Sequence, residues 1–137
     1  MSQENVEIIA RLYDEFLARP ERIASPEQLA FFDPAVEIHQ SDSLLGTKGT
    51  FHGYDGLGRA GREVFEVFSE AQFVPARLVD AGDQVAAQVE FRGIGKEGGV
   101  RIARTVGHVW TLKRGRILAW HVYFDPAEAF DAVGLSE

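Results

Sequence analysis

The chain has 137 residues and a mass of 15.2 kDa, the usual size of one domain, and its 45% hydrophobic and 26% charged residues are typical of a globular protein. The 14 basic and 21 acidic residues give a net charge of −7 without an extended basic cluster, which argues against a general nucleic-acid binder. The absence of cysteine excludes disulfides, thiolate catalysis and cysteine-bound metal sites. Because the chain has no long apolar run, we expect no signal peptide and no membrane span, and we expect a cytoplasmic location.

The first half of the chain predicts helices, within a single domain that covers residues 1–137. Ser2 can cap a first helix, whose apolar residues recur at three- and four-residue spacing until Pro20 ends it. Ser25 caps a short second helix that has Pro26 in its first turn. The further elements predicted in this half are a short strand at 36–40, a polar, glycine-bearing loop at 41–53 and a helix from about residue 55.

From Phe73 onward the apolar period changes to two, which is typical of strands. Asp125, Pro126 and Glu128 then suit the cap and first turn of a C-terminal helix, and Gly134 suits the left-handed residue after its end. Helices grouped before an antiparallel sheet indicate an α+β domain. Strands are predicted at about 72–80, 84–94, 100–113 and 116–124.

The turn between the last two strands decides which side chains share a face. A two-residue type I′ turn would need a positive φ at Arg114, which a non-glycine residue disfavours. We therefore expect a type I turn over Lys113 and Arg114, followed by Gly115 as a left-handed bulge, and this register sets His108 opposite Trp120. The shared face then holds Ile102, Arg104, Val106, His108, Trp110, Leu112, Leu118, Trp120, Val122 and Phe124, and the opposite face carries Ile117, Ala119, His121 and Tyr123.

The preceding strand can add polar residues to the shared face. If the loop at 95–99 pairs Ile94 with Val100, Glu90 lies opposite Arg104. A shift of one residue in this loop would turn Glu90 to the other face, and both registers stay open. In the first register, the strand adds Ala86, Gln88, Glu90 and Arg92.

Several segments together resemble the SnoaL-like branch of the NTF2-like superfamily. They are Gly-Tyr-Asp-Gly-Leu at 53–57, Thr-Val-Gly-His-Val-Trp-Thr-Leu at 105–112, and the run from Gly115 through Tyr-Phe-Asp at 123–125 to Gly-Leu at 134–135. The resemblance implies a curved antiparallel sheet wrapped around helices into a cone with one deep pocket, and often a dimer through the outer sheet face. Members include polyketide cyclases, ketosteroid isomerase, scytalone dehydratase and limonene-epoxide hydrolase, so the fold alone does not name the chemistry.

The resemblance also implies roles for individual residues. The tyrosine, the acid and the base of ketosteroid isomerase fall at or near Tyr13, His108 and His39, although both aspartates of that enzyme are missing here. The two aspartates and the arginine of the epoxide hydrolase fall at Gln88, Glu90 and Val122. One carboxylate remains, so epoxide hydrolysis is not expected.

His108 is the central candidate from the residues themselves, because a histidine in an apolar face needs partners for its ring nitrogens. Burial lowers its pKa and a carboxylate such as Glu90 would raise it, so it could act near neutral pH. The plainer alternatives are a core histidine, a core Tyr13 and a cross-strand ion pair of Glu90 with Arg104. His39 faces outward if its apolar neighbours face the core. The candidate catalytic residues are His108, Tyr13 and His39; the candidate substrate-binding residues are Glu90, Gln88, Arg104, Trp110, Trp120 and Val122.

Two further patterns carry little weight. Residues 56–61 match the dinucleotide pattern G-x-G-x-x-G, but no buried strand precedes the first glycine. His39, Asp42 and His52 do not have the spacing of a closed metal site. We therefore expect no cofactor and no metal.

The sequence favours a cofactor-independent acid–base enzyme, of the isomerase, cyclase or dehydratase type, that acts on a hydrophobic cyclic small molecule. An alternative is a pocket of the same kind that binds a small molecule without reaction. A third is a dimeric interaction module without a ligand. We expect a homodimer through the outer sheet face, with Ile117, Ala119, His121 and Tyr123 in the contact.

Overall fold

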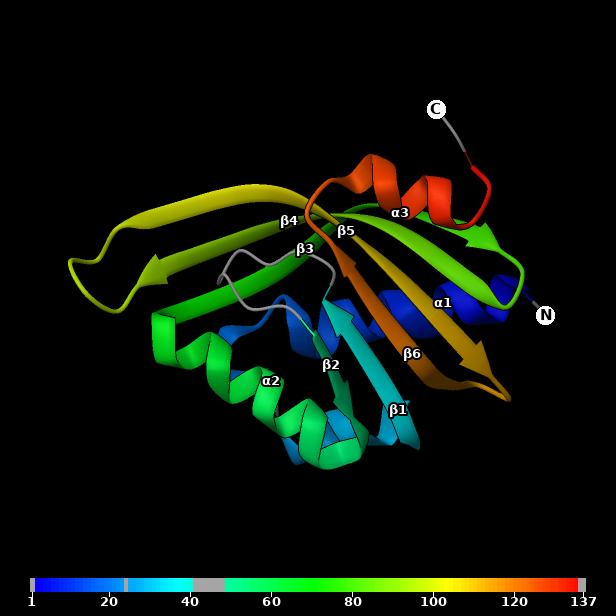
Figure 1. The fold of residues 1–137 in the computed structure, drawn as a ribbon, viewed down its shortest axis with the longest axis horizontal. Coiled ribbons are helices and arrows are strands. Elements are labelled where there is room, and N and C mark those ends of the chain that lie inside the picture. The colour runs from blue at the N-terminus through cyan, green and yellow to red at the C-terminus, as the bar shows by residue number, and fades with distance from the viewer. Residues whose placement is uncertain (1, 24, 41–48, 136–137) are drawn as a thin grey trace.

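The computed structural model describes residues 2–23, 25–40 and 49–135. Three helices and a six-stranded sheet make up most of this part of the chain (Figure 1). The helices are α1 (Ser2–Leu12), α2 (Gly53–Val67) and α3 (Pro126–Ala132), with short 3₁₀ helices at Pro20–Arg22 and Pro26–Phe31. The strands are β1 (Phe32–Gln40), β2 (Gly49–His52), β3 (Phe68–Ala81), β4 (Gln84–Gly95), β5 (Arg101–Lys113) and β6 (Arg116–Tyr123).

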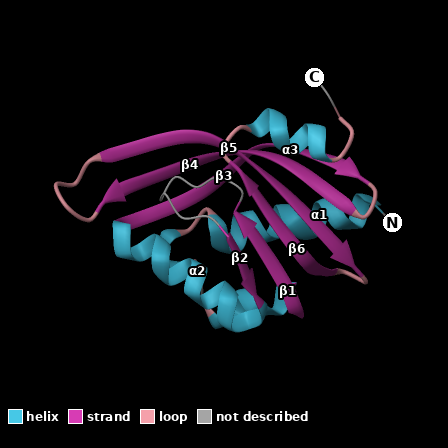
Figure 2. Cartoon of the chain, viewed as in Figure 1, coloured by secondary structure: helices cyan, strands magenta, loops and turns pink. Residues whose placement is uncertain are grey.

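The predicted α+β class is confirmed, with helices before strands and a short helix at the end (Figure 2). The sheet has the order β2-β1-β6-β5-β4-β3. Among the described residues, the predicted antiparallel pairing holds for four of the five strand pairs, and the remaining pair differs because β1 runs parallel to β6. The short β2, which pairs with β1, lies within the stretch that was expected to be a loop, and residues 41–48 of that stretch fall outside the described residues.

The turn between β5 and β6 differs from its prediction. It is a two-residue turn in which both Arg114 and Gly115 have positive φ, at 55° and 79°. A bulge follows at Leu118, so Trp110 lies opposite Trp120 and His108 opposite Val122. The predicted shared face survives around His108 because the bulge restores the alternation. Ile117, predicted on the outer face, is fully buried in the core.

The register of β4 against β5, which the sequence left open between two alternatives, is given by the structure. Ala87 lies opposite His108, Val89 opposite Val106 and Phe91 opposite Arg104, so the odd-numbered residues of β4 face inward. Glu90 lies opposite Thr105 and, with Gln88, faces the outer side of the sheet. Of the two registers, the structure therefore has the one in which Glu90 faces away from the inner side of the sheet, and Glu90 does not pair with Arg104.

The helices cover both faces of the sheet (Figure 1). The helices α1 and α2 pack on the inner face, whereas α3 packs on the outer face across β4, β5 and β6. Asp125 caps α3 as predicted, since its carboxylate accepts from the Ala127 N–H at 2.9 Å. Gly107 lets α3 approach closely, because a Cβ there would lie 2.7 Å from the Ala129 Cβ. Within the described residues, no helix has the length and apolar character needed to cross a membrane.

Candidate functional site

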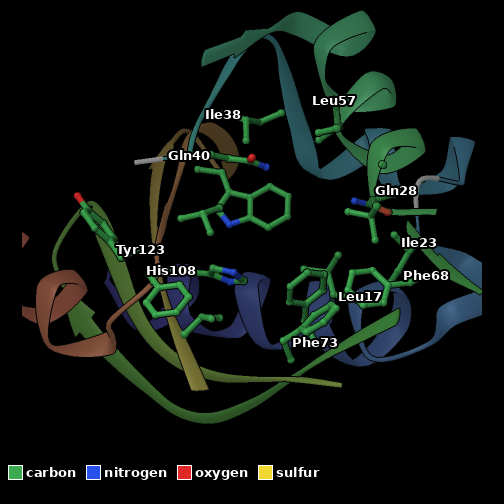
Figure 3. A pocket seen from close by; sticks show the side chains of 18 residues that line it. Leu17, Ile23, Gln28, Ile38, Gln40, Leu57, Phe68, Phe73, His108 and Tyr123 are labelled. Atoms are coloured by element: carbon green, nitrogen blue, oxygen red, sulfur yellow. The ribbon is translucent and has the colours of Figure 1, made fainter. Parts of the chain in front are cut away.

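A largely apolar pocket lies on the inner face of the sheet, against α2 and the turn that follows α1 (Figure 3). It has a volume of about 90 Å³ and is partly open to solvent. An apolar cavity of about 150 Å³ is enough to hold benzene, so this pocket has room for part of one ring, with the rest of a ligand at its mouth. Ring-bearing side chains form much of its wall: Phe68, Phe73, Phe91, His108, Trp120 and Phe124.

A chain of two buried hydrogen bonds fixes His108 in this wall. The Trp110 Nε1–H donates to the Tyr13 hydroxyl oxygen at 3.0 Å, and the hydroxyl lies 2.6 Å from the His108 Nδ1. All three side chains are fully buried. Tyr13 begins a π-helical turn (Tyr13–Leu17) that continues α1. Trp110 and His108 lie two residues apart on the same face of β5. The helix and the strand thus hold the imidazole in one orientation.

The direction of these bonds assigns the tautomer of His108. An indole N–H can only donate, so Tyr13 accepts from Trp110 and its own proton is left to be donated to His108 Nδ1. Nδ1 is then the acceptor, and a neutral imidazole carries its proton on Nε2. The Nε2 is buried and has no hydrogen-bond partner among the described residues. Because the His108 ring is directed into the pocket (Figure 3), this N–H can donate a hydrogen bond to an acceptor atom of a ligand there.

Burial sets the protonation of both groups. It lowers the pKa of His108 from 6.5 to about 3, so the imidazole is neutral at physiological pH. Burial also raises the pKa of Tyr13 well above its usual value, against a smaller lowering by the hydrogen bond from Trp110. Neither group changes its charge near pH 7. The pair is therefore suited to donating a hydrogen bond and poorly suited to releasing or taking up a proton.

Trp120 supplies a second buried donor. Its Nε1 has no partner among the described residues, and its ring lines the pocket at 5.2 Å from the His108 ring, centroid to centroid. Trp110 stacks on the far side of Trp120 at 4.4 Å and does not line the pocket itself. A buried N–H without a partner is costly. Two of them in one apolar pocket indicate a ligand with acceptor atoms.

Carboxylates are missing from the part of the pocket wall that the structure describes. His108 and Tyr123 are its titratable residues, and Figure 3 shows the Tyr123 hydroxyl directed away from the other labelled side chains. Further polar groups come from the amides of Gln28 and Gln40. General base catalysis by Asp or Glu therefore has no group among these residues.

The predicted site residues fall into two sets. His108, Tyr13, Trp110, Trp120 and Val122 lie together, at the pocket or directly behind it.

The remaining predicted residues lie elsewhere. Gln88 is half-buried on the outer face, and Glu90 there accepts from the Arg92 Nε–H at 2.7 Å, so neither can act on His108 through the pocket. Arg104 is exposed beside the pocket.

His39 also lies on the outer face, apart from His108. Its Nε2 is 2.9 Å from a Glu37 carboxylate oxygen, and its ring stacks on His121 at 4.4 Å. Burial, with a smaller contribution from His39, lowers the pKa of His121. Ile38 and Gln40, the neighbours of His39 on β1, line the pocket instead. The correspondence of His39 to a catalytic base is thus not reflected in its position.

Sequence reasoning missed Phe91 and Phe73, which lie opposite each other on β4 and β3 and both line the pocket. A signal for Phe91 was present in the sequence. The residues Val85, Ala87, Val89 and Phe91 are all apolar, whereas the alternating set contains Gln88, Glu90 and Arg92. This contrast in polarity between the two sets predicts which face of β4 is the inner one more directly than the length of the loop at 95–99 does.

The two weaker patterns also find places in the fold. The glycines at 56–61 lie inside α2, where a Cβ on Gly56 would come within 2.9 Å of Phe51. Gly56 therefore allows close packing of α2 on β2. Asp42 lies outside the described residues, and no group of three or more potential metal ligands occurs within the described ranges.

Comparisons with known proteins agree with this geometry. The family model described as a SnoaL-like domain matches residues 9–120. Among curated proteins, no sequence matches the chain. An NTF2-like protein of unknown function from Burkholderia pseudomallei K96243 has 25% identity and a TM-score of 0.76, over 96% of this chain and 98% of that one.

Two further solved structures share the fold at lower identity. TerC, co-crystallised with polyporic acid, has 22% identity and a TM-score of 0.75, over 95% of this chain and 98% of that one. A protein from Jannaschia sp. CCS1, named as a candidate SnoaL-like polyketide cyclase, has 17% identity and a TM-score of 0.73, over 99% of this chain and 95% of that one. The predicted family and its fold are confirmed.

Proposed function

We infer the function from the site, because the chain belongs to the SnoaL-like family, whose fold hosts more than one chemistry. We propose that the protein binds a small, largely apolar cyclic molecule through a carbonyl-type oxygen. This oxygen accepts a hydrogen bond from the His108 Nε2–H. The observation that carries the proposal is the buried, unpartnered Nε2 that Tyr13 and Trp110 hold toward the pocket. TerC, a structural neighbour, was crystallised with a small-molecule ligand, which is consistent with a binding role.

The character of the pocket supports the choice of ligand. Its aromatic wall suits a flat ring, and both unpartnered side-chain nitrogens in it, on His108 and Trp120, are N–H donors. A ligand that offers only donors would leave these groups unsatisfied, which costs about 1–3 kcal/mol for each. A ketone, a quinone or a lactone satisfies at least one of them.

A second candidate function is catalysis by the same contact. A neutral histidine that donates to a carbonyl oxygen stabilises the negative charge that develops there during enolisation, as isomerisation, cyclisation or dehydration requires. The α proton passes to solvent water at the mouth of the pocket, which is partly open, because the described wall offers no carboxylate base. The fixed orientation of the ring favours this candidate. Proton shuttling by His108 near neutral pH has no support, because Glu90 faces the other side of the sheet and burial lowers the histidine pKa to about 3.

Acetophenone, a one-ring ketone, tests the binding proposal. The variant His108→Asn keeps an amide near the position of Nδ1, within reach of Tyr13, and removes the donor to the pocket. His108→Gln places an amide near Nε2 and restores that donor. Loss of a net hydrogen bond of about 1.4 kcal/mol weakens binding roughly tenfold. We expect this loss in His108→Asn and partial recovery in His108→Gln, by calorimetric titration.

The bound carbonyl gives a second readout. Hydrogen bonding lowers the carbonyl stretching frequency of acetophenone in the wild type, and His108→Asn reverses this shift. The shift stays constant from pH 5 to 8, because the imidazole remains neutral. Equal affinity and equal frequency in the wild type and His108→Asn would refute the proposal. Deuterium exchange at the acetophenone methyl group separates the two functions, since only the catalytic one accelerates exchange in a way that depends on His108.

A further inference from the structure

Arg104 is an exposed cation beside the pocket. It lies on β5, and its guanidinium carbon is 4.0 Å from the centroid of the Phe124 ring. Phe124 lines the pocket, so the cation stacks on the ring of one wall residue. Among the described residues, this side chain has no hydrogen bond and no ion pair.

The strand register places Arg104 at the rim. It lies opposite Phe91 and two residues before Val106 on the same face of β5, and both of these line the pocket. Three pocket-lining residues therefore surround Arg104, while its own side chain reaches solvent. This is the place where an apolar wall meets water.

Some other arginines of the chain have carboxylate partners. Arg92 pairs with Glu90, and Arg11 pairs with Glu15. Arg104 makes no ion pair within the described ranges, although the whole chain carries a net charge of −7. A guanidinium that rests on an aromatic ring keeps its N–H edges available for an anion.

We propose that Arg104 binds an anionic substituent, such as a carboxylate, on the cyclic ligand whose carbonyl oxygen lies at His108. The inference rests on the proposed function and narrows its ligand class to anionic cyclic carbonyl compounds. Four residues of strand separate Arg104 from His108, a span of about 13 Å between their Cα atoms. Arg104 and His108 lie on the same face of β5, and a long arginine side chain can cover part of this distance, so a ligand of one or two rings bridges the two groups.

Matched pairs of ketones test the inference. Acetophenone is compared with 4-acetylbenzoate, and 2-acetylnaphthalene with 6-acetyl-2-naphthoate, by calorimetric titration at low salt. The variant Arg104→Met removes the cation and keeps an unbranched apolar side chain. Arg101→Met is its control, because Arg101 is exposed on the same strand and alternates to the other face.

We expect the wild type and Arg101→Met to bind at least one carboxylate about five- to tenfold more tightly than its neutral partner, as for a partly exposed charged hydrogen bond. In Arg104→Met this preference disappears, while the affinity for acetophenone stays the same. The preference also shrinks as salt is raised.

Failure of the inference is distinct from failure of the proposed function. Equal binding of neutral and anionic ketones by the wild type, or a preference that survives in Arg104→Met, overturns the role of Arg104 and leaves the binding at His108 intact. Acetophenone binding that does not depend on His108 overturns the proposed function. If the wild type binds none of the four ketones, both are overturned.

Discussion

Replacing Tyr13 by Phe tests the hydrogen-bond chain on which the site depends. The substitution removes one oxygen and leaves two buried polar atoms without a partner, the Trp110 Nε1–H and the His108 Nδ1. Each unsatisfied group costs about 1–3 kcal/mol, and some relaxation of the two rings offsets part of this. We expect a loss of about 2–4 kcal/mol in the free energy of unfolding, a large share of the ~5–15 kcal/mol that holds a domain together.

Urea unfolding at pH 7 measures this loss. Tyr54→Phe is the matched control, because the Tyr54 hydroxyl donates one bond to the Phe32 carbonyl at 2.9 Å from a partly exposed position. Its removal costs about 0.5–1.5 kcal/mol.

Nitrogen NMR of the histidine rings gives the second measurement. In the wild type, we expect the His108 proton on Nε2 alone, and in Tyr13→Phe a mixture of both tautomers. The reasoning is refuted if Tyr13→Phe is no less stable than Tyr54→Phe, or if wild-type His108 carries its proton on Nδ1.

Two further predictions concern pH and assembly. The folded state holds the His108 pKa at about 3, below the 6.5 of an unfolded chain, so its contribution to stability is complete above pH 6.5 and is lost as the pH falls toward 3. Between pH 7 and 4.5 urea unfolding should show an extra loss of about 2–3 kcal/mol in the wild type relative to His108→Asn, and equal losses would contradict the burial of a neutral imidazole. The outer sheet face beyond α3, with Ala119, His121 and Tyr123, is proposed as a homodimer contact. Sedimentation equilibrium should then give twice the 15.2 kDa of one chain, and a species of 15.2 kDa alone would contradict the dimer.

Most of the element pattern was predictable because the helices and the strands other than the short β2 carry their own signals. The apolar spacing of the first helix, the cap at Asp125 and the left-handed Gly134 all reappear in the structure. The β5–β6 turn was not predictable from propensity alone. A left-handed Arg114 costs about 1–2 kcal/mol, but a type I′ turn matches the twist of the two strands. The twist of the sheet outweighs the local preference of one residue.

The site was predictable in part for a related reason. The alternation along β5 identifies His108, Trp110 and Val106 as neighbours on one face, and a period of two needs no knowledge of the rest of the fold. The contact between Tyr13 and His108 joins residues that are 95 positions apart, and no local pattern encodes it. The outward position of His39, by contrast, follows from the alternation on β1, because Val36 and Ile38 face the core.

The bulge at Leu118 also constrains how this hairpin can change length. The tight turn and the extra residue each displace the pairing by one position, and together they preserve the parity of the strand. Deletion of Leu118 alone would exchange Trp120 and Val122 with His121 and Tyr123 across the sheet. Insertions or deletions of two residues keep the same side chains of β6 in the pocket wall. A change of one residue moves them to the outer face of the sheet.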